Sequence, residues 1–414
     1  MIFDALETLP DDPVGQVYVA LRNDANPDKL DLGIGVYRDD HGRSPIMASV
    51  RQAMTNLLEK QITKEYLSPV GNMRYCSVNE RLVLGADHPA LNAGRLLTVQ
   101  TPGAGGGLRA GADMIKAASH SATVWVPAPT WSHQRLVFAT AGVRMAEYPY
   151  YDVQANQLLF DEMIEALRKS KPGDAVLLHG CCHNPTGEDL SHDQWRAVAA
   201  MLAQTGAMPF VDLAYQGFGD GIEEDTFGVR LFAAEAPEMI LAVSSSKSFG
   251  IYRDRAGTLS ILCKNVADKK NTARHLSKVT RALYFMPPDA GAAIVVEVLE
   301  DEALEKAWRA ELDGMRARIV ALRKTFAAVL KRELDSSDFN YIIRQKGMFS
   351  LLPLTPEALT ELRTQHGIYL MPDARINLAA LTDANEQRVG SAIAAVIARQ
   401  NNASAKSRAR HARG

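Results

Sequence analysis

Cysteine is scarce in this sequence, with four residues among 414, at positions 76, 181, 182 and 263. This number and scatter exclude a disulfide framework, and a bridge between the neighbours Cys181 and Cys182 would be strained. We therefore expect reduced thiols in a cytoplasmic protein.

Long apolar runs, a targeting segment and a basic excess are also missing. No run approaches the roughly 18 apolar residues of a membrane-spanning helix. The first residues, MIFDALETLPDDPV, lack the basic region and apolar core of a signal peptide. The formal net charge is −2, whereas a surface that binds nucleic acid usually shows as a basic excess. The expected partners are therefore small molecules, and neither nucleic acid nor a membrane.

What the sequence does contain is an alternation of β-rich and helical patterns between residues 95 and 265. Nearly continuous apolar runs suit strands that are covered on both faces. We expect such strands at 95–101, 122–129, 174–182, 208–215, 238–246 and 258–264. The alternation predicts an α/β fold, with a mostly parallel central sheet sandwiched by helices, whose ligands bind beyond the carboxyl ends of the strands.

The chain is long enough for two structural units. A large domain is expected over residues 48–310, and a smaller α/β domain over 311–398 together with an irregular N-terminal segment, 1–47. A long helical stretch, 299–334, would connect the two. Residues 399–414 are polar and basic without apolar periodicity and are expected to form a disordered tail.

Four motifs carry polar groups at the ends of predicted strands. Each has an ordinary interpretation: a tight glycine turn, an Asn-Pro turn, a helix-capping Asp212 and an exposed loop lysine, Lys247. The motifs are TPGAGGGLRAGAD (101–113), HGCCHNPTGEDLS (179–191), PFVDLAYQGFG (209–219) and SSSKSFGIYRDRAG (244–257).

The same motifs also support a functional interpretation. Glycines before a helix that begins near Leu108 would form an anion site. A cis bond after Asn184 would direct its side chain into a cleft, and a buried Asp212 needs a cation or hydrogen-bond donors. Burial would make Lys247 a nucleophile, and Arg255 suits a phosphate. Together they match pyridoxal phosphate, which needs a phosphate cradle, a lysine to bond covalently and a carboxylate for its ring nitrogen.

In these motifs the sequence resembles the aspartate/aromatic branch of the fold-type I pyridoxal-phosphate aminotransferases, along nearly the whole chain from LGIGVYRDDHGRSPI to ARINLAAL. The resemblance implies a homodimer with shared active sites and no metal. It also implies ping-pong transfer of an amino group between an L-amino acid and a 2-oxo acid such as 2-oxoglutarate.

The resemblance further implies roles for individual residues. Lys247 would bond the cofactor and move a proton, Asp212 would face the ring nitrogen, and Tyr215 would bind the phenolate oxygen with Asn184. The other implied cofactor ligands are Gly103, Ala104, Gly105, Ser244, Ser246 and Arg255 at the phosphate, Trp131 stacked on the ring, and Tyr66 from the neighbouring subunit. The implied substrate ligands are Arg375 for the α-carboxylate, Gly35, Ile34, Trp131, Asn184, Phe349, Met286, and Arg281 from the neighbouring subunit for a distal carboxylate.

The sequence departs from the family pattern at several of these places. The segment Gly103-Ala104-Gly105 lacks the usual threonine hydroxyl, and His133-Gln134 stands where an Asn-His pair is common, so the support of Asp212 is altered or displaced. Bulky apolar residues replace small or polar ones at Phe285 and Met286, and a glutamate precedes Tyr66 where Asn is common.

The amino donor stays open at this point. Arg281 favours an aspartate- or glutamate-type donor, because its planar guanidinium group can bind a distal carboxylate through two hydrogen bonds. We place this donor class first. Phe285 and Met286 favour an aromatic donor, and a specialised pathway substrate is a third possibility. The sequence fits a lyase or decarboxylase less well than a transaminase, because Arg375 would hold the carboxylate that a decarboxylase must release. A cofactor-binding regulator would usually add a DNA-binding module, and no such signal precedes residue 48.

Overall fold

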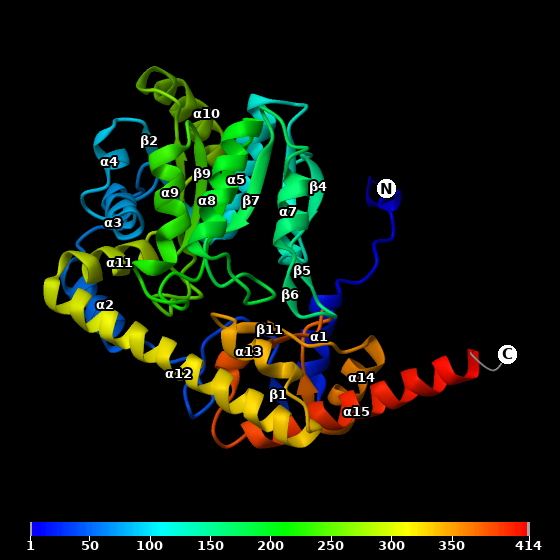
Figure 1. Ribbon diagram of the computed structural model, residues 1–414. Helices are drawn as coiled ribbons and strands as arrows, with labels where there is room; N and C mark the ends of the chain where they lie inside the picture. The colour runs from blue at the N-terminus through cyan, green and yellow to red at the C-terminus, as the bar shows by residue number, and fades with distance from the viewer. Residues whose placement is uncertain (1, 412–414) are drawn as a thin grey trace.

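A computed structural model describes residues 2–411, with side chains described for residues 2–402. It places a large domain around a seven-stranded sheet and a smaller domain beneath it, and the long helix α12 (Glu302–Leu334) runs from one into the other (Figure 1). No helix in the described part of the chain is long and apolar enough to cross a membrane.

The large sheet has the strand order β2-β10-β9-β8-β7-β3-β4. Strand β10 (Ala256–Leu262) runs antiparallel to both of its neighbours, and the other adjacent pairs are parallel. The six strands other than β10 run in the same direction: β2 (Leu96–Pro102), β3 (Thr123–Ala128), β4 (Arg144–Pro149), β7 (Ala175–His179), β8 (Met208–Leu213) and β9 (Met239–Ser244). The mostly parallel sheet predicted from the apolar runs is therefore confirmed.

Strand β4 was not among the predicted strands. It lies at the sheet edge, and Arg144, Met145 and Glu147 are exposed there, so it lacks the apolar run that marks the central strands.

Alternate residues of the central strands enter different cores, as a period of two requires. Phe210 and Ile240 belong to the cluster beneath helix α5 (Gly103–Ala118), whereas Val211 and Leu241 belong to the cluster on the opposite face. Both faces of the sheet are therefore covered, as their sequence pattern predicted.

Helix α5 begins at Gly103 and not near Leu108 as expected, so the glycine run forms its first turns. The glycines also let the helix approach the sheet: a Cβ atom on Gly111 would lie 2.6 Å from the ring of Phe210. Glycine here serves close packing as well as the turn.

The remaining elements of the large domain surround the sheet. They are α2 (Ala48–Lys60), α3 (Met73–Leu84), α4 (Pro89–Asn92), α6 (Ser132–Thr140), β5 (Tyr151–Asp152), β6 (Gln157–Leu158), α7 (Phe160–Leu167), α8 (His192–Thr205), η2 (Glu224–Thr226), α9 (Phe227–Glu235), α10 (Val266–Tyr284) and α11 (Ala290–Glu300). Helix α8 begins with a capping box of Ser191 and Gln194 and ends at Gly206, which has the left-handed conformation that favours glycine.

The smaller domain has its own core around Phe326, Leu330 and Ile393. Its elements are β1 (Leu30–Asp31), η3 (Asp338–Asn340), α13 (Tyr341–Arg344), β11 (Phe349–Leu351), α14 (Pro356–His366), β12 (Ile368–Tyr369), β13 (Arg375–Asn377), η4 (Leu378–Ala380) and α15 (Glu386–His411). Pairing of β1 with β12 attaches the N-terminal segment to this domain.

Three local expectations differ from the structure. The N-terminal segment contains η1 (Ile2–Ala5) and helix α1 (Pro13–Asn23), which Asp12 caps and Pro13 begins. The stretch 299–334 is two helices, because Asp301 caps α12 and ends α11. Helix α15 continues through most of the segment expected to be a disordered tail, because residues 399–411 are mainly helix formers without glycine or proline; residues 412–414 lie outside the described part.

Candidate active site

A cavity of about 800 Å³ lies where the carboxyl ends of the parallel strands face the smaller domain. Its walls come from α1, from the ends of the sheet, from the start of α6 and from the smaller domain. It is lined by Asp12, Pro13, Val14, Tyr18, Gly35, Gly105, Trp131, Ser132, His133, Leu136, Asn184, Tyr215, Lys247, Arg255, Phe349, Met371, Pro372, Asp373 and Arg375.

Lys247 reaches this cavity from the turn after β9. Its Nζ atom lies 4.7 Å from the centre of the Tyr215 ring. Burial lowers the pKa of Lys247 to about 8, although the negative charge of Asp212 opposes this shift. The loop therefore holds a lysine whose amine is partly neutral near physiological pH, and not the ordinary solvated lysine that this segment alone would suggest.

Asp212 lies at the end of β8 and is buried. Burial raises the pKa of this carboxyl to about 6, while a hydrogen bond from Gln134 and the charge of Lys247 oppose the rise. Its Oδ2 atom accepts a hydrogen bond of 2.6 Å from Gln134 Nε2, but its Oδ1 atom is buried without a hydrogen-bond partner. Burial without a partner is costly for a carboxylate oxygen, so a hydrogen-bond donor from a ligand would be favourable at this position.

Gln134 Oε1 accepts hydrogen bonds from His179 and from the Thr130 hydroxyl, and the backbone of Asn184 in turn orients His179. The N–H of Asn184 donates to His179 Nδ1 (3.1 Å), so the proton of the neutral ring lies on Nε2, which donates to Gln134 Oε1 (3.0 Å). This leaves the amide nitrogen of Gln134 to face Asp212. Burial lowers the pKa of His179 to about 3, so the ring is neutral. The departure at Gln134 therefore keeps a donor at Asp212, and this contact is one that the sequence did not predict.

An anion cradle forms where α5 begins beside Arg255. The first N–H groups of a helix have no partner within the helix, and Arg255 Nη1 donates to Ser246 Oγ at 3.3 Å. Gly103 has φ of +66°, and a Cβ atom there would lie 2.6 Å from Arg255 Nη2, so only glycine lets the guanidinium lie against the helix start. Ser244 is buried behind them, and its Oγ accepts from the N–H of Ser246.

Arg375 forms the opposite wall of the cavity. Its Nη1 atom donates to Asn184 Oδ1 and its Nη2 atom to the carbonyl of Gly33, both at 2.9 Å, and its Nε atom is buried without a partner. The guanidinium stacks 4.2 Å from the Phe349 ring centre. A Cβ atom on Gly35 would lie 2.9 Å from Phe349, so this glycine makes room for the ring. The bond between Asn184 and Pro185 is cis.

Some predicted residues do not reach this cavity from their own chain. Tyr66 is 83% exposed, Arg281 is exposed at the end of α10, and Met286 contacts the N–H of Leu67 instead. Ile34 is near but is tied by its carbonyl to Asn377. Of the remaining predicted residues, Gly35, Phe349 and Arg375 line the cavity from the smaller domain, and the others lie at the edge of the large sheet around Lys247.

The cavity wall also includes residues that the sequence did not single out. Val14 and Tyr18 come from α1, and Leu136 and Met371 add further apolar surface. No catalytic motif marks these positions, so only folding places them beside the strand ends.

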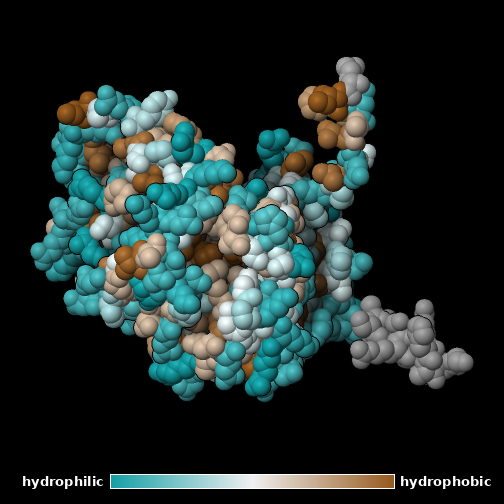
Figure 2. Space-filling model, turned by 90° about the horizontal axis from the view of Figure 1, so that it is seen from above, coloured by the Kyte–Doolittle hydropathy of each residue, from teal (hydrophilic) through white to brown (hydrophobic). Residues whose placement is uncertain are grey.

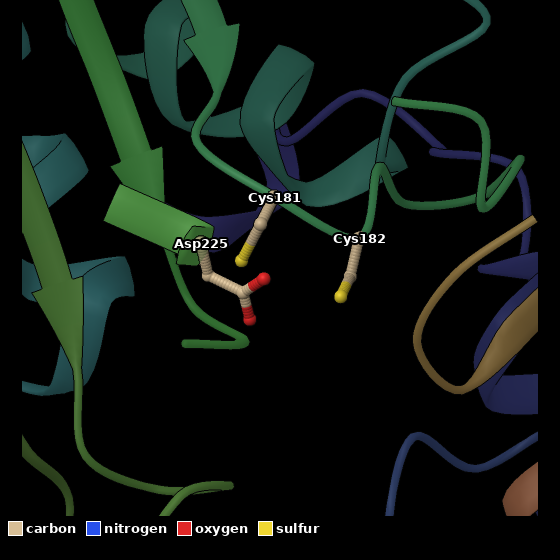
Figure 3. A group of neighbouring side chains, drawn as sticks. All are labelled: Cys181, Cys182 and Asp225. Atoms are coloured by element: carbon tan, nitrogen blue, oxygen red, sulfur yellow. The ribbon is translucent and has the colours of Figure 1, made fainter. Parts of the chain in front are cut away.

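A second group of chemically reactive side chains lies nearby (Figure 3). Cys181, Cys182 and Asp225 bring sulfur and oxygen atoms within 4.8 Å of one another. The Asp225 carboxylate, however, accepts backbone N–H groups from Gly217 and Gly219, and burial raises the pKa of Cys182 to about 11. The carboxylate is therefore engaged in fastening the loop after β8, and we assign it this structural role.

The cavity fits pyridoxal phosphate. The unpartnered Asp212 Oδ1 atom suits a protonated ring nitrogen, and the cradle of Arg255 and α5 suits a phosphate. The unpartnered Arg375 Nε atom suits the carboxylate of an amino acid.

Comparison with known proteins agrees with this geometry. The family model for aminotransferase class I and II matches residues 27–393. The chain is 40% identical to the aromatic-amino-acid aminotransferase of Pseudomonas aeruginosa and 38% identical to the aspartate aminotransferase of Escherichia coli. In each case the match covers 96% of this chain, and it covers 99% and 100% of the relative.

The crystal structure of the aromatic-amino-acid aminotransferase from Burkholderia pseudomallei, covalently bound to pyridoxal phosphate, matches with a TM-score of 0.92 at 40% identity. That match covers 96% of this chain and 99% of the other. The chain therefore belongs to the class I and II aminotransferases and is a transaminase that depends on pyridoxal phosphate.

Proposed function

We propose that the cavity between the two domains is the active site of this transaminase and that Lys247 is its catalytic lysine. The observation that carries the proposal is the position of Lys247, with its lowered pKa, between the unpartnered Asp212 Oδ1 atom and the Arg255 cradle. When bound, pyridoxal phosphate supplies a cationic conjugated ring that takes up the electron pair released at the substrate Cα.

The residues of the chain would divide the remaining tasks. Asp212 keeps the proton on the ring nitrogen, and Asn184 and Tyr215 hold the phenolate oxygen. Arg375 would fix the substrate α-carboxylate, and the neutral amine of Lys247 would take the Cα proton and return it at C4′ of the cofactor. The remaining implied ligands would complete the phosphate and ring contacts: Gly103, Ala104, Gly105, Trp131, Ser244, Ser246 and Arg255.

The lowered pKa of Lys247 leads to a test on the apoenzyme. Only the neutral amine attacks a carbonyl, so the rate of covalent attachment should rise with pH and level off above about 8. With an ordinary solvated lysine, the rate would keep rising until the pH reached about 10.4. Stopped-flow absorbance after mixing with pyridoxal phosphate measures this rate. A rate that still climbs tenfold per pH unit above pH 9 would contradict the buried position of the amine.

For the amino donor, we propose an aspartate- or glutamate-type dicarboxylic acid first, with an aromatic amino acid as the second candidate. The distal carboxylate would meet Arg281 of a neighbouring subunit. The aromatic candidate is favoured by the apolar wall of Val14, Leu136 and Met371. Relatives with either specificity match the chain about equally well.

Replacing Arg281 with alanine should separate the two classes of substrate. Loss of a bidentate contact with the distal carboxylate should lower kcat/KM for aspartate about 100-fold. The value of kcat/KM for phenylalanine should stay within about threefold of the wild type. Single-turnover kinetics with each donor measure the effect. Arg274→Ala, an exposed arginine on the same helix, is the control. Equal losses for both donors would assign Arg281 a role other than recognising the distal carboxylate.

We propose that the active unit is a homodimer with shared sites. Large apolar side chains are exposed near α2 and the end of α10: Leu58 (85%), Ile62 (95%) and Phe285 (53%). The N-terminal residues before α1 also project from the body of the molecule, and their apolar side chains Ile2, Phe3, Leu6 and Leu9 are exposed (Figure 2). Exposed apolar surface of this extent favours a partner, and a partner would bring Tyr66 and Arg281 to a site they do not reach in their own chain.

Mixed dimers test this sharing. Lys247→Ala and Arg281→Ala chains should each be nearly inactive on aspartate alone. After co-refolding in equal amounts, half of the dimers would be hybrids with one complete site of two, so about a quarter of the wild-type activity should return. No recovery despite proven hybrid formation would place Arg281 in the site of its own chain.

We also propose a cytoplasmic location, because the four cysteines are free and buried, as suits a reducing compartment. Fractionation of the native host, with detection by antibody, tests this location.

A further inference from the structure

The start of α5 lacks a side chain at one position of the phosphate cradle. Gly105 lies in the first turn of the helix and lines the cavity, but it offers only its backbone. The resemblance noted above implies a threonine hydroxyl here. The cradle is therefore one side-chain donor short, unless another residue supplies it.

His133, at the start of α6, occupies the adjoining space. Its Nε2 atom would lie 3.6 Å from a Cβ atom built on Gly105, so the imidazole stands where a longer side chain at 105 would extend. The Trp131 ring lies beside it, with ring centres 4.9 Å apart. Within the described part of the chain, neither ring nitrogen of His133 has a hydrogen-bond partner, although the ring lines the cavity.

The charge around His133 suits an anion. Burial and the neighbouring Arg255 lower the pKa of His133 below its usual value. The other charged or titratable groups that line the cavity are Lys247 and Tyr215 at the strand ends, Asp12 and Tyr18 on α1, and Asp373 and Arg375 on the smaller domain. An anion held between Arg255 and His133 would relieve their mutual repulsion and favour protonation of the imidazole.

We propose that His133 is a ligand of the cofactor phosphate and donates a hydrogen bond from Nε2 in place of a hydroxyl at position 105. This rests on the proposed active site, in which Arg255 and the start of α5 form the phosphate cradle. The ligand class is a phosphate monoester dianion, which accepts hydrogen bonds from both the guanidinium and the imidazole.

The test compares two cofactor forms that differ only in the phosphate. Dissociation constants of pyridoxal phosphate and of pyridoxal are measured for the apoenzyme by quenching of tryptophan fluorescence. His133→Asn should weaken pyridoxal phosphate about 10- to 100-fold and leave pyridoxal within about twofold. Adding Gly105→Thr to His133→Asn should restore most of the lost affinity, because the hydroxyl then takes over the contact.

A pH series on the wild type gives a second readout. Affinity for pyridoxal phosphate, corrected by that for pyridoxal, should fall as pH rises through the pKa of His133 in the complex, and this fall should be absent in His133→Asn. Thermal unfolding of each apoenzyme checks that the variants fold.

The outcomes separate this proposal from the active-site proposal. Loss of phosphate-specific affinity in Arg255→Gln but not in His133→Asn would overturn the role of His133 alone. Unchanged affinity for pyridoxal phosphate in both variants would show that Arg255 and the start of α5 do not bind the phosphate. Equal weakening of both cofactor forms in His133→Asn would assign the ring to support of Trp131 and would also overturn the proposal.

Discussion

Replacing Lys247 with alanine should lower the rate of amino transfer at least about 10⁴-fold. The variant loses both the covalent bond to the cofactor and the amine that moves the Cα proton, and proton transfer by a positioned group alone contributes 10²- to 10⁴-fold. Steady-state turnover with aspartate and 2-oxoglutarate measures the change.

The fold should survive this substitution, because removing a partly buried cation with a lowered pKa also removes a desolvation cost. Cofactor should still bind but should wash out during gel filtration, since only the covalent bond is missing. Lys264→Ala, an exposed lysine after β10, is the matched control and should behave as the wild type. Transamination retained by Lys247→Ala would refute the assigned role.

Replacing Asp212 with alanine should be the next most damaging change. The loss of a buried ionic partner costs about 3–5 kcal/mol, so the rate should fall roughly 10²- to 10⁴-fold. Asp212→Glu keeps the charge and should lose less than Asp212→Ala. A variant with near wild-type turnover and an unchanged visible spectrum would show that the ring nitrogen has another partner.

The raised pKa of Asp212 also predicts how cofactor affinity changes with pH. Without cofactor its pKa is raised to about 6, so the carboxyl is increasingly neutral as pH falls below that value. A neutral acid attracts a cationic ring less well, so cofactor affinity should decrease on acidification through about pH 6. Asp212→Ala should lack this part of the pH dependence when affinity is measured by equilibrium dialysis.

The sequence predicted the central fold because buried parallel strands are nearly continuous apolar runs, which few other structures require. It located Lys247 and Asp212 because the carboxyl ends of such strands meet at one edge, and Arg255 lies at the same edge because it precedes β10, which runs antiparallel. It did not predict the edge strand β4, where Arg144, Met145 and Glu147 are exposed, or helix α1 in the cavity wall. Those positions depend on contacts between distant segments, and a polar edge or a capped helix carries no sign of what it will face.

The contact between Gln134 and Asp212 shows the same limit at the level of one residue. The sequence indicated a departure from the family pattern here, which suggested altered support of the carboxylate. Only the structure shows that an amide, oriented by His179, supplies the donor. Residue type alone does not reveal which end of an amide faces a neighbour.

The series of hydrogen bonds that ends at Asp212 fixes the orientation and the protonation state of its members. Each link runs in one direction, from the Asn184 backbone through His179 and Gln134 to the carboxylate, and a reversed amide would set oxygen against oxygen at Asp212 and N–H against N–H at His179. An amide does not titrate, and His179 would take up a proton only near pH 3. The hydrogen-bonding groups behind Asp212 therefore keep the same protonation state across the physiological pH range, so their support of the carboxylate does not change with pH there.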